Sequence, residues 1–517
     1  MSTATLEPSA EQTGRSPSII EVRGLTKRFG DLVATGGVDF DVRPGEVHSL
    51  LGENGAGKST LMKLLYGVYQ PDAGEILVDG VVHRLDSPAD ARALGIGMVF
   101  QDLRLIPAFT VAENIALSLP GGGFRYRRQA VERQILEAGA ELGFSVDPKA
   151  LVHHLSIGER QRVEILKVLM SGARLVILDE PTSVLAPQEV DGLFTAIRSL
   201  RAKGLAVVII THKLHETRAI ADRLSILRAG RMVGSGIDPT TVDDRELISA
   251  MVGREVPPLP IDRSDPPADR PAALRVTGVH VRGDGGNTAL HDIHLEVRAG
   301  EVMGVAGVAG SGQRELYEAV LGLRPLHTGD VHIAAVEMAK CDPGAAIGLG
   351  AVGIPEDPIS DAVVPGLDVT EHLALSNLAS LRKGLGIDWA RARELVAELD
   401  QQIGLRMVAH DRTVADLSGG NVQRVMLTRA FGVDCTLLVA AYPSRGLDVA
   451  TTRRTQELLL AQREAGAGVL FISEDLDELM ELSDQIAVLH NGHLAGVVTP
   501  AEVDRYAIGQ LMLGGSE

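Results

Sequence analysis

Alternating apolar and polar positions begin two similar stretches of the chain, one in each half. The alternating apolar residues are Val38, Phe40 and Val42 in the first half and Ile293, Leu295 and Val297 in the second. This period of two predicts a half-buried strand in each place. Residues 174–180 (RLVILDE) and 205–212 (LAVVIITH) contain unbroken apolar runs. Such runs are typical of buried parallel strands, so the pattern predicts a parallel sheet.

Helix-forming residues are enriched in two longer regions, about residues 103–170 and 357–430, and the segment 127–142 (RRQAVERQILEAGAEL) is an example. We therefore predict a helical subdomain in each half. The expected fold class is α/β, with two tandem domains. Each domain would have a parallel-sheet core, an antiparallel β edge and a helical subdomain.

The chain repeats its own sequence over a long period. GEV at residues 45–47 returns at 300–302, and LSIGERQRV at 155–163 returns as LSGGNVQRV at 417–425. A repeat of this length is too long for a solenoid unit. Each copy is therefore expected to be a domain in its own right.

The limits of the repeat predict four parts of the chain. Residues 19–252 form the first domain and residues 274–517 the second. Between them, residues 253–273 contain six prolines, which favour an extended, semi-rigid linker. Residues 1–18 are expected to be a disordered N-terminal arm.

Composition narrows the possible partners and the compartment. The 517 residues include 50 Lys and Arg against 68 Asp and Glu, so the net charge is −18, and only 3% are aromatic. This balance disfavours a nucleic-acid partner. The two cysteines, Cys341 and Cys435, lie far apart and match no metal-ligand spacing, so they suggest neither a disulfide framework nor a zinc site. The lack of a disulfide framework favours the reducing cytosol. No apolar run reaches the 18 or so residues that cross a bilayer, so any membrane role requires a partner.

A phosphate-binding pattern, G-x-x-x-x-G-K-S, follows an apolar segment and precedes a helical run that starts at Thr60. Its residues are Gly52, Glu53, Asn54, Gly55, Ala56, Gly57, Lys58 and Ser59. The glycines let backbone N–H groups surround phosphates at a helix N-terminus. Lys58 would reach the β- and γ-phosphates of ATP, and the Ser59 hydroxyl would bind Mg²⁺.

Two adjacent carboxylates end the apolar run at residues 174–180. Asp179 is predicted to hold Mg²⁺, and Glu180 to orient or deprotonate water. An acidic pair at a strand end is more often only solvated. The phosphate-binding pattern upstream favours the catalytic interpretation here.

The P-loop, Gln101, LSIGE, LVILDEP and His212 follow one another in the order and approximate spacing of ATP-binding cassette (ABC) ATPases. Residues 19–514 resemble the tandem ATP-binding subunits of bacterial sugar-type ABC importers, and GIGMVFQ, VEILKVL and AAYPSRGLDV are most similar to the nucleoside-importing branch. The resemblance implies that Gln101 senses Mg²⁺ and that Glu180 is the catalytic base. It also implies that His212 holds the γ-phosphate and Phe29 stacks on adenine. A core role for Phe29 and a strand-end cap for His212 are the alternatives.

The same resemblance implies ATP and Mg²⁺ as cofactors. It implies two integral-membrane permease subunits and an extracytoplasmic solute-binding protein as partners, at the cytoplasmic face of the membrane, with a nucleoside or a sugar as solute. The alternative is a soluble tandem ABC ATPase that acts in translation or DNA repair without a membrane partner. Such a protein is expected to have two intact sites and a basic surface.

The second half has lost the chemistry of the first at every nucleotide-contacting position that aligns. The replacements are Gln313 for Lys58, Arg314 for Ser59, Glu356 for Gln101, Ala441 for Asp179, Tyr442 for Glu180 and Glu474 for His212. Its signature LSGGN is nevertheless fuller than LSIGE, in which Ile157 stands at the place of Gly419. Head-to-tail pairing in the family implies that Ser418, Gly419 and Gly420 face the nucleotide of the first domain, with Asp448 beside them. We expect one hydrolytic site per chain.

Overall fold

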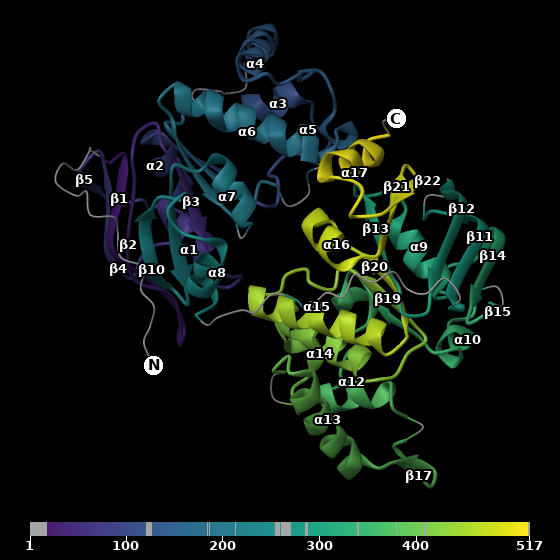
Figure 1. The fold of residues 1–517 in the computed structure, drawn as a ribbon. Helices are drawn as coiled ribbons and strands as arrows, with labels where there is room; N and C mark the ends of the chain where they lie inside the picture. Colours follow the sequence, from purple (N-terminus) through teal and green to yellow (C-terminus); the bar gives the residue numbers. More distant parts are fainter. Residues whose placement is uncertain are drawn as a thin grey trace. The chain divides into compact units, whose positions relative to one another are not determined.

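The structure is a computed structural model that describes most of the chain. The described residues are 18–119, 127–182, 185, 187–211, 213–253, 259, 270–284, 288–338, 341–378, 380–407 and 410–514. The chain divides into two units, Met1–Pro257 (unit 1) and Pro258–Glu517 (unit 2), which Figure 1 colours purple to teal and teal to yellow. Apart from its last residue, the predicted N-terminal arm lies outside the described residues, as does most of the predicted linker.

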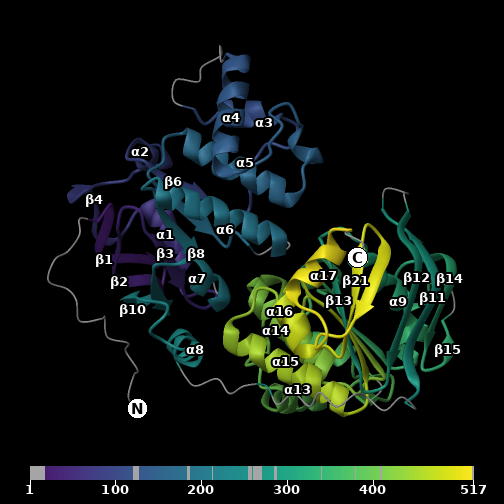
Figure 2. The same ribbon diagram turned by 45° about the horizontal axis from the view of Figure 1, so that its top comes forward.

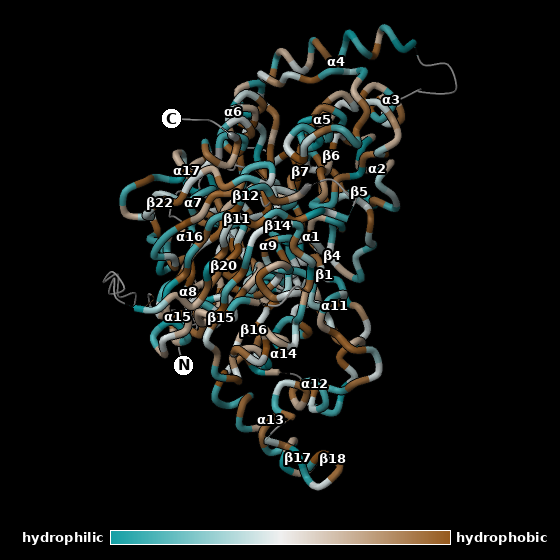
Figure 3. Tube along the Cα trace, turned by 90° about the vertical axis from the view of Figure 1, so that its right-hand side faces the viewer, coloured by the Kyte–Doolittle hydropathy of each residue, from teal (hydrophilic) through white to brown (hydrophobic). Residues whose placement is uncertain are grey.

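The core of unit 1 is a six-stranded sheet in the order β10-β9-β3-β8-β7-β6, parallel except for the edge strand β10. Its strands are β3 (Val47–Leu51), β6 (Ile96–Val99), β7 (Leu175–Asp179), β8 (Ala206–Ile210), β9 (Arg223–Arg228) and β10 (Arg231–Ile237). Alternate residues of β7 pack into two separate hydrophobic clusters, one on each face of the sheet. Because both faces are covered, β7 is apolar at four consecutive positions, as its brown colouring in Figure 3 shows.

A second, antiparallel sheet of unit 1 has the order β2-β1-β4-β5. Its strands are β1 (Ile20–Phe29), β2 (Leu32–Val42), β4 (Ala73–Val78) and β5 (Val81–His83). The helices of the unit are α1 (Lys58–Leu65), α2 (Pro88–Ala93), α3 (Val111–Ala116), α4 (Arg128–Leu142), α5 (Ile157–Met170), α6 (Pro187–Ala202), α7 (Leu214–Ile220) and α8 (Asp244–Val252). Helix α1 shares one hydrophobic cluster with both sheets, and α3, α4 and α5 gather into the predicted helical subdomain (Figures 1 and 2).

Unit 2 repeats this plan. Its core sheet has the order β16-β19-β20-β13-β21-β22, and its antiparallel sheet has the order β12-β11-β14-β15. The strands are β11 (Ala272–Arg282), β12 (Thr288–Arg298), β13 (Val302–Gly307), β14 (Leu326–Ile333), β15 (Val336–Glu337), β16 (Ala351–Ile354), β19 (Leu437–Ala441), β20 (Gly468–Ile472), β21 (Gln485–His490) and β22 (His493–Val498). Strand β11 starts two residues before the predicted start of the second domain.

The helical elements of unit 2 are accompanied by a short hairpin. The helices are α9 (Gln313–Val320), α10 (Pro343–Gly348), α11 (Pro358–Asp361), α12 (Val369–Leu375), α13 (Trp389–Ile403), α14 (Gly419–Phe431), α15 (Val449–Glu464), α16 (Leu476–Leu482) and α17 (Arg505–Met512). A short hairpin of β17 (Arg382–Lys383) and β18 (Gly386–Ile387) precedes α13. No helix among the described residues has the length and apolar character that crossing a membrane requires. The α/β fold class predicted from the sequence is confirmed.

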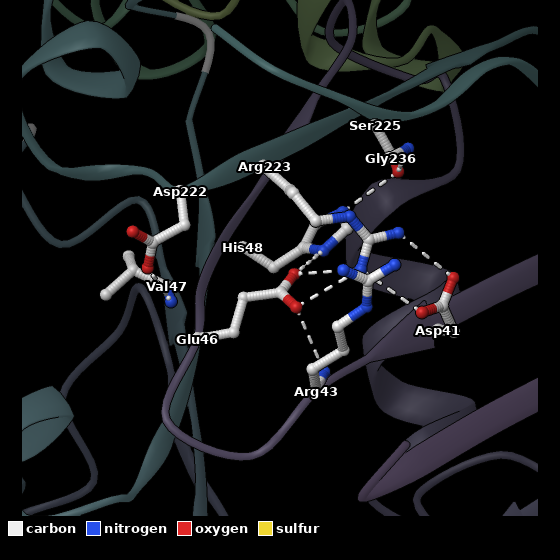
Figure 4. Close-up of polar contacts among 9 residues, drawn as sticks. All are labelled: Asp41, Arg43, Glu46, Val47, His48, Asp222, Arg223, Ser225 and Gly236. Atoms are coloured by element: carbon white, nitrogen blue, oxygen red, sulfur yellow. Dashed lines mark hydrogen bonds and ion pairs between the residues drawn. The ribbon is translucent and has the colours of Figure 1, made fainter. Parts of the chain in front are cut away.

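A buried polar cluster joins the two sheets of unit 1 (Figure 4). His48 Nδ1 donates to Glu46 Oε1 at 2.6 Å, and His48 Nε2 lies 2.9 Å from Ser225 Oγ. Arg223 binds Glu46, which directly precedes β3 of the core sheet, and Asp41 of β2 in the antiparallel sheet. The Ser-His-Glu order resembles a nucleophilic triad, but His48 and Ser225 are completely buried. A substrate has no access, so we assign the cluster a structural role.

Candidate functional site

The predicted phosphate-binding loop of unit 1 connects β3 to α1. Gly57 ends the loop with φ 102°, and a Cβ atom there would lie 2.2 Å from the carbonyl oxygen of Ala34. Only glycine fits this position without moving the backbone. Gly312 of unit 2 has φ 106°, so both units form the same turn.

Lys58 lies inside this loop. Its side chain is buried, and Nζ donates hydrogen bonds to the carbonyl oxygens of Gly52 at 2.7 Å and Glu53 at 3.0 Å. Burial lowers the pKa of Lys58, while the charges of Glu180 and Asp179 oppose that shift. The loop therefore presents a cation at the N-terminus of α1, where the helix dipole also favours an anion.

Ser59 of α1, Asp179 and Glu180 at the end of β7, and Gln101 after β6 converge beside Lys58. Ser59 Oγ donates to Asp179 Oδ1 at 3.3 Å, and Gln101 Nε2 donates to Glu180 Oε2 at 3.4 Å. Burial, and then the adjacent charge of Glu180, raise the pKa of Asp179. Two adjacent carboxylates, one of them buried, favour a bound cation.

The neighbourhood of Glu180 contains a cavity of about 390 Å³, lined in part by Gln101, Asp179 and Glu180. Glu180 itself has a left-handed backbone with φ 47°, and its N–H donates to the carbonyl oxygen of Ile210 at 3.0 Å. His212, the predicted γ-phosphate contact, lies outside the described residues. The structure therefore brings together Lys58 and its four polar neighbours, all predicted from the sequence.

The predicted adenine platform, Phe29, is the last residue of β1. Its ring is 43% exposed and meets the edge of Tyr69 with ring centroids 5.3 Å apart. Lys27 Nζ lies 5.6 Å from the centre of the Phe29 ring. A ring this exposed is not a core residue, so it remains accessible to a nucleotide base.

Unit 2 keeps the backbone of this site without its chemistry. Gln313 takes the place of Lys58, is equally buried, and donates from Nε2 to the carbonyl oxygen of Val308 at 3.1 Å. Tyr442 has φ 48°, and its N–H donates to Ile472 at 2.8 Å, as Glu180 donates in unit 1. The loss of catalytic groups is therefore a change of side chains on an unchanged backbone.

Arg445 fills part of the space that the lost groups leave. It forms an ion pair with Glu356 at 3.0 Å and lies 4.0 Å from Glu474. Both carboxylates stand where unit 1 has Gln101 and His212. A protein cation thus sits among the residues that replace the predicted Mg²⁺ and phosphate contacts.

The two signature sequences start their helices differently. In unit 1 the Ser156 Oγ accepts from the Glu159 N–H at 3.2 Å, and the Glu159 carboxylate accepts from the Ser156 N–H at 2.8 Å. This capping box places a negative charge at the N-terminus of α5. In unit 2 the residue matching Glu159 is the neutral Asn421, whose Nδ2 donates to Ser418 Oγ at 3.0 Å.

The start of α14 therefore lacks the negative charge that Glu159 places at the start of α5. The Ser418 side chain caps no backbone N–H of α14, and a Cβ at Gly419 would meet nothing within 4 Å. The predicted signature residues Ser418, Gly419 and Gly420 thus form an open helix N-terminus. The Glu159 cap was not predicted, although the spacing S-x-x-E was a readable signal for it.

Asp448 has a local structural role. It caps α15 by accepting from the Thr451 N–H at 2.8 Å, and it forms an ion pair with Arg424 of α14 at 2.6 Å. Burial opposes the ionisation of Asp448, but Thr451 and Arg424 outweigh it and hold its pKa below the usual value. The aspartate therefore links the loop after β19 to the signature helix.

Comparison with known proteins identifies the family. The ABC transporter family matches residues 35–183 and 290–442, one match in each unit. The chain belongs to the ABC transporter family. It is 40% identical over 531 aligned positions to the glucose import ATP-binding protein TsgD13 of Haloferax volcanii, with 96% of each chain covered. It is 37% identical to the nucleoside import ATP-binding protein NupA of Lactococcus lactis, covering 96% of this chain and 99% of the relative.

The fold also matches a solved structure over most of the chain. A solved structure described as RNase-L Inhibitor has a TM-score of 0.60 and 20% identity, covering 90% of this chain and 87% of that one. At this identity the likeness concerns the fold alone. Family membership makes the chain an ATP-binding subunit that hydrolyses ATP to drive transport, of the tandem sugar- and nucleoside-import type.

Proposed function

We propose that the chain energises uptake of a nucleoside or a sugar through partner permeases, and that only one nucleotide site per chain hydrolyses ATP. The observation that carries the proposal is the contrast between the two units. Lys58, Asp179 and Glu180 converge at the P-loop of unit 1, whereas unit 2 has Gln313, Ala441 and Tyr442 on the same backbone turns.

ATP binding is assigned to the loop of unit 1. Its backbone N–H groups and the N-terminus of α1 would surround the β- and γ-phosphates, and Lys58 would exchange its bonds to Gly52 and Glu53 for phosphate oxygens. The exposed ring of Phe29 would stack on adenine. Asn54 and Thr60 belong to the same loop and helix start.

The residues present fit a magnesium ion. Ser59, Asp179 and Gln101 offer hydroxyl, carboxylate and amide oxygens, the hard ligands that Mg²⁺ prefers. A bound cation would offset the burial and the Glu180 charge that raise the pKa of Asp179. When bound, Mg²⁺ neutralises charge on the β- and γ-phosphates.

Glu180 is the proposed general base. Its carboxylate would accept a proton from the attacking water, and Gln101, 3.4 Å away, would orient that carboxylate. The Glu180 N–H donates to Ile210 of β8 and holds the strained backbone of Glu180 in place. This bond fixes the position of the backbone that carries the carboxylate. His212 is proposed to contact the γ-phosphate, as the family resemblance implies.

The open start of α14 is proposed to complete the site of unit 1. Ser418, Gly419 and Gly420 would donate to the γ-phosphate, a contact that becomes stronger as charge develops during hydrolysis. The start of α5 is a poor counterpart because the Glu159 carboxylate repels phosphate. The support for head-to-tail pairing is this difference in charge, together with the family resemblance.

The proposed partners are two membrane permeases and an extracytoplasmic solute-binding protein, which would hold the chain at the cytoplasmic face of the membrane. The relatives named for glucose and nucleoside import support these partners and leave both solute classes open. The alternative in translation or DNA repair rests on likeness of fold alone.

Capture of the tagged chain from cells that produce it tests the proposal. We expect integral-membrane proteins to co-purify and ATP hydrolysis to rise when solute and binding protein are added. Thermal shift of that binding protein would identify the solute, because a ligand at 100 times its Kd stabilises a protein by about 2.7 kcal/mol. Co-purification with ribosomes and no membrane protein would refute the proposal.

A further inference from the structure

Unit 2 contains a cavity of about 1010 Å³ between α9, α11, α14 and the ends of β16 and β19. Three large side chains fill the matching positions of unit 1, and three smaller residues replace them in unit 2. Met98 and Tyr66 are buried in unit 1, and the Tyr66 and Phe100 rings pack with centroids 5.9 Å apart. The replacements in unit 2 are Gly353 for Met98, Leu321 for Tyr66 and Pro355 for Phe100.

Arg429 of α14 lines this cavity. Within the described part of the chain, its guanidinium has no hydrogen bond and no ion pair. The matching residue of unit 1, Lys167, binds Glu164 at 2.6 Å, but unit 2 has Met426 at the place of Glu164. Burial lowers the pKa of Arg429. A partly buried, unpaired cation is costly, so binding an anion relieves the cost.

Tyr317 of α9 provides a second donor on the same wall. It stands where unit 1 has Met62, and its hydroxyl oxygen would lie 2.7 Å from a Cβ atom at Gly353. Tyr317 and Arg429 both line the cavity. Burial raises the pKa of Tyr317, so the hydroxyl keeps its proton and can donate to an anion.

The other charged residues that line the cavity disfavour binding of a highly charged ligand. Three arginines are already engaged with two glutamates, and two aspartates add negative charge. These residues are Arg314, Arg324, Arg445, Glu318, Glu356, Asp357 and Asp361. A triphosphate would face four carboxylates with one unpaired cation available, whereas a single carboxylate needs only that cation. Apolar wall residues such as Leu323 and Ile472 suit an organic body.

We propose that this cavity binds a small organic monocarboxylate, held by the guanidinium of Arg429 and the hydroxyl of Tyr317. The site is separate from ATP hydrolysis in unit 1 and goes beyond the proposed transport function. It arises from the same divergence that removed the nucleotide contacts of unit 2.

Titration calorimetry of the full chain with benzoate, in nucleotide-free buffer, tests the proposal. We expect saturable binding to the wild-type chain and at least tenfold weaker binding to Arg429→Gln. Met426→Glu should weaken binding similarly, because it gives Arg429 the partner that Lys167 has in unit 1. Lys167→Gln is the matched control and should bind benzoate like the wild type.

Two further measurements make the outcome decisive. Unchanged ATP hydrolysis by Arg429→Gln would show that the variant is folded, and inorganic phosphate in place of benzoate tests the class of anion. Absence of saturable benzoate binding, equal affinity in Arg429→Gln, or binding of phosphate and not benzoate would each overturn the proposal.

Discussion

Replacing Glu46 by Gln should destabilise unit 1 and spare unit 2. The Glu46 carboxylate is 5% exposed and binds His48 at 2.6 Å and Arg223 at 3.1 Å. Removing one partner of a buried ion pair costs about 3–5 kcal/mol. Arg223 keeps Asp41, at 3.2 Å, as a second partner, so we expect about 3 kcal/mol. For a domain of this size that loss lowers the melting temperature by about 6–12 °C.

The effect should depend on pH in a defined direction. Burial tends to raise the pKa of Glu46, but His48 and Arg223 outweigh burial and hold the pKa below its usual value. The ionised carboxylate therefore stabilises unit 1 above the unfolded-state pKa of Glu46. That stability is lost as the pH falls through the folded-state pKa. The difference between wild type and Glu46→Gln should shrink in acid.

Unit 2 provides a matched control at the same position. Burial raises the pKa of Glu301, which has Met303 and Ala487 where unit 1 has His48 and Ser225. Its ionised form costs stability as the pH rises, so Glu301→Gln should be neutral or stabilising at pH 7. Fluorescence of Trp389, the single tryptophan, follows unit 2, and circular dichroism follows both units. Equal destabilisation by the two substitutions would refute the reasoning.

Substitutions at three positions of the proposed nucleotide site, two of them with a matched control, have expected outcomes. Ser418→Arg should lower ATP turnover at least about 100-fold, because it blocks the start of α14. Ser156→Arg should lower turnover less. Steady-state rates in the reverse order would contradict head-to-tail pairing. Glu180→Gln should lower kcat by about 10²–10⁴ while ATP still binds, and Tyr442→Phe should leave kcat unchanged, which single-turnover kinetics would check. Phe29→Ala should raise the KM for ATP about tenfold at constant kcat, and an unchanged KM would argue against adenine stacking.

Local patterns predicted the parts of the site that are contiguous in the chain. The P-loop, the apolar run before Asp179 and the strand before His212 were each predicted within a few residues. The reason is physical, because strand burial and phosphate binding impose patterns on neighbouring residues. The loss of chemistry in unit 2 was equally readable, since the repeat aligns Gln313 with Lys58.

Contacts between distant residues left no such pattern. The buried cluster of unit 1 joins Glu46 and His48 to Arg223 and Ser225, about 177 positions later. No sequence pattern in either segment indicates that the two segments are in contact. The cavity of unit 2 likewise is lined by residues from segments far apart in the sequence, which only the packed structure brings together.

Mg-ATP turnover of two single variants, Lys58→Ala and Gln313→Ala, tests the one-site account most directly. Both side chains occupy the same buried position of their loops, but only Lys58 is charged. The account predicts that Lys58→Ala lowers turnover about 10²–10³-fold and that Gln313→Ala leaves it essentially unchanged. Equal losses in the two variants would contradict it.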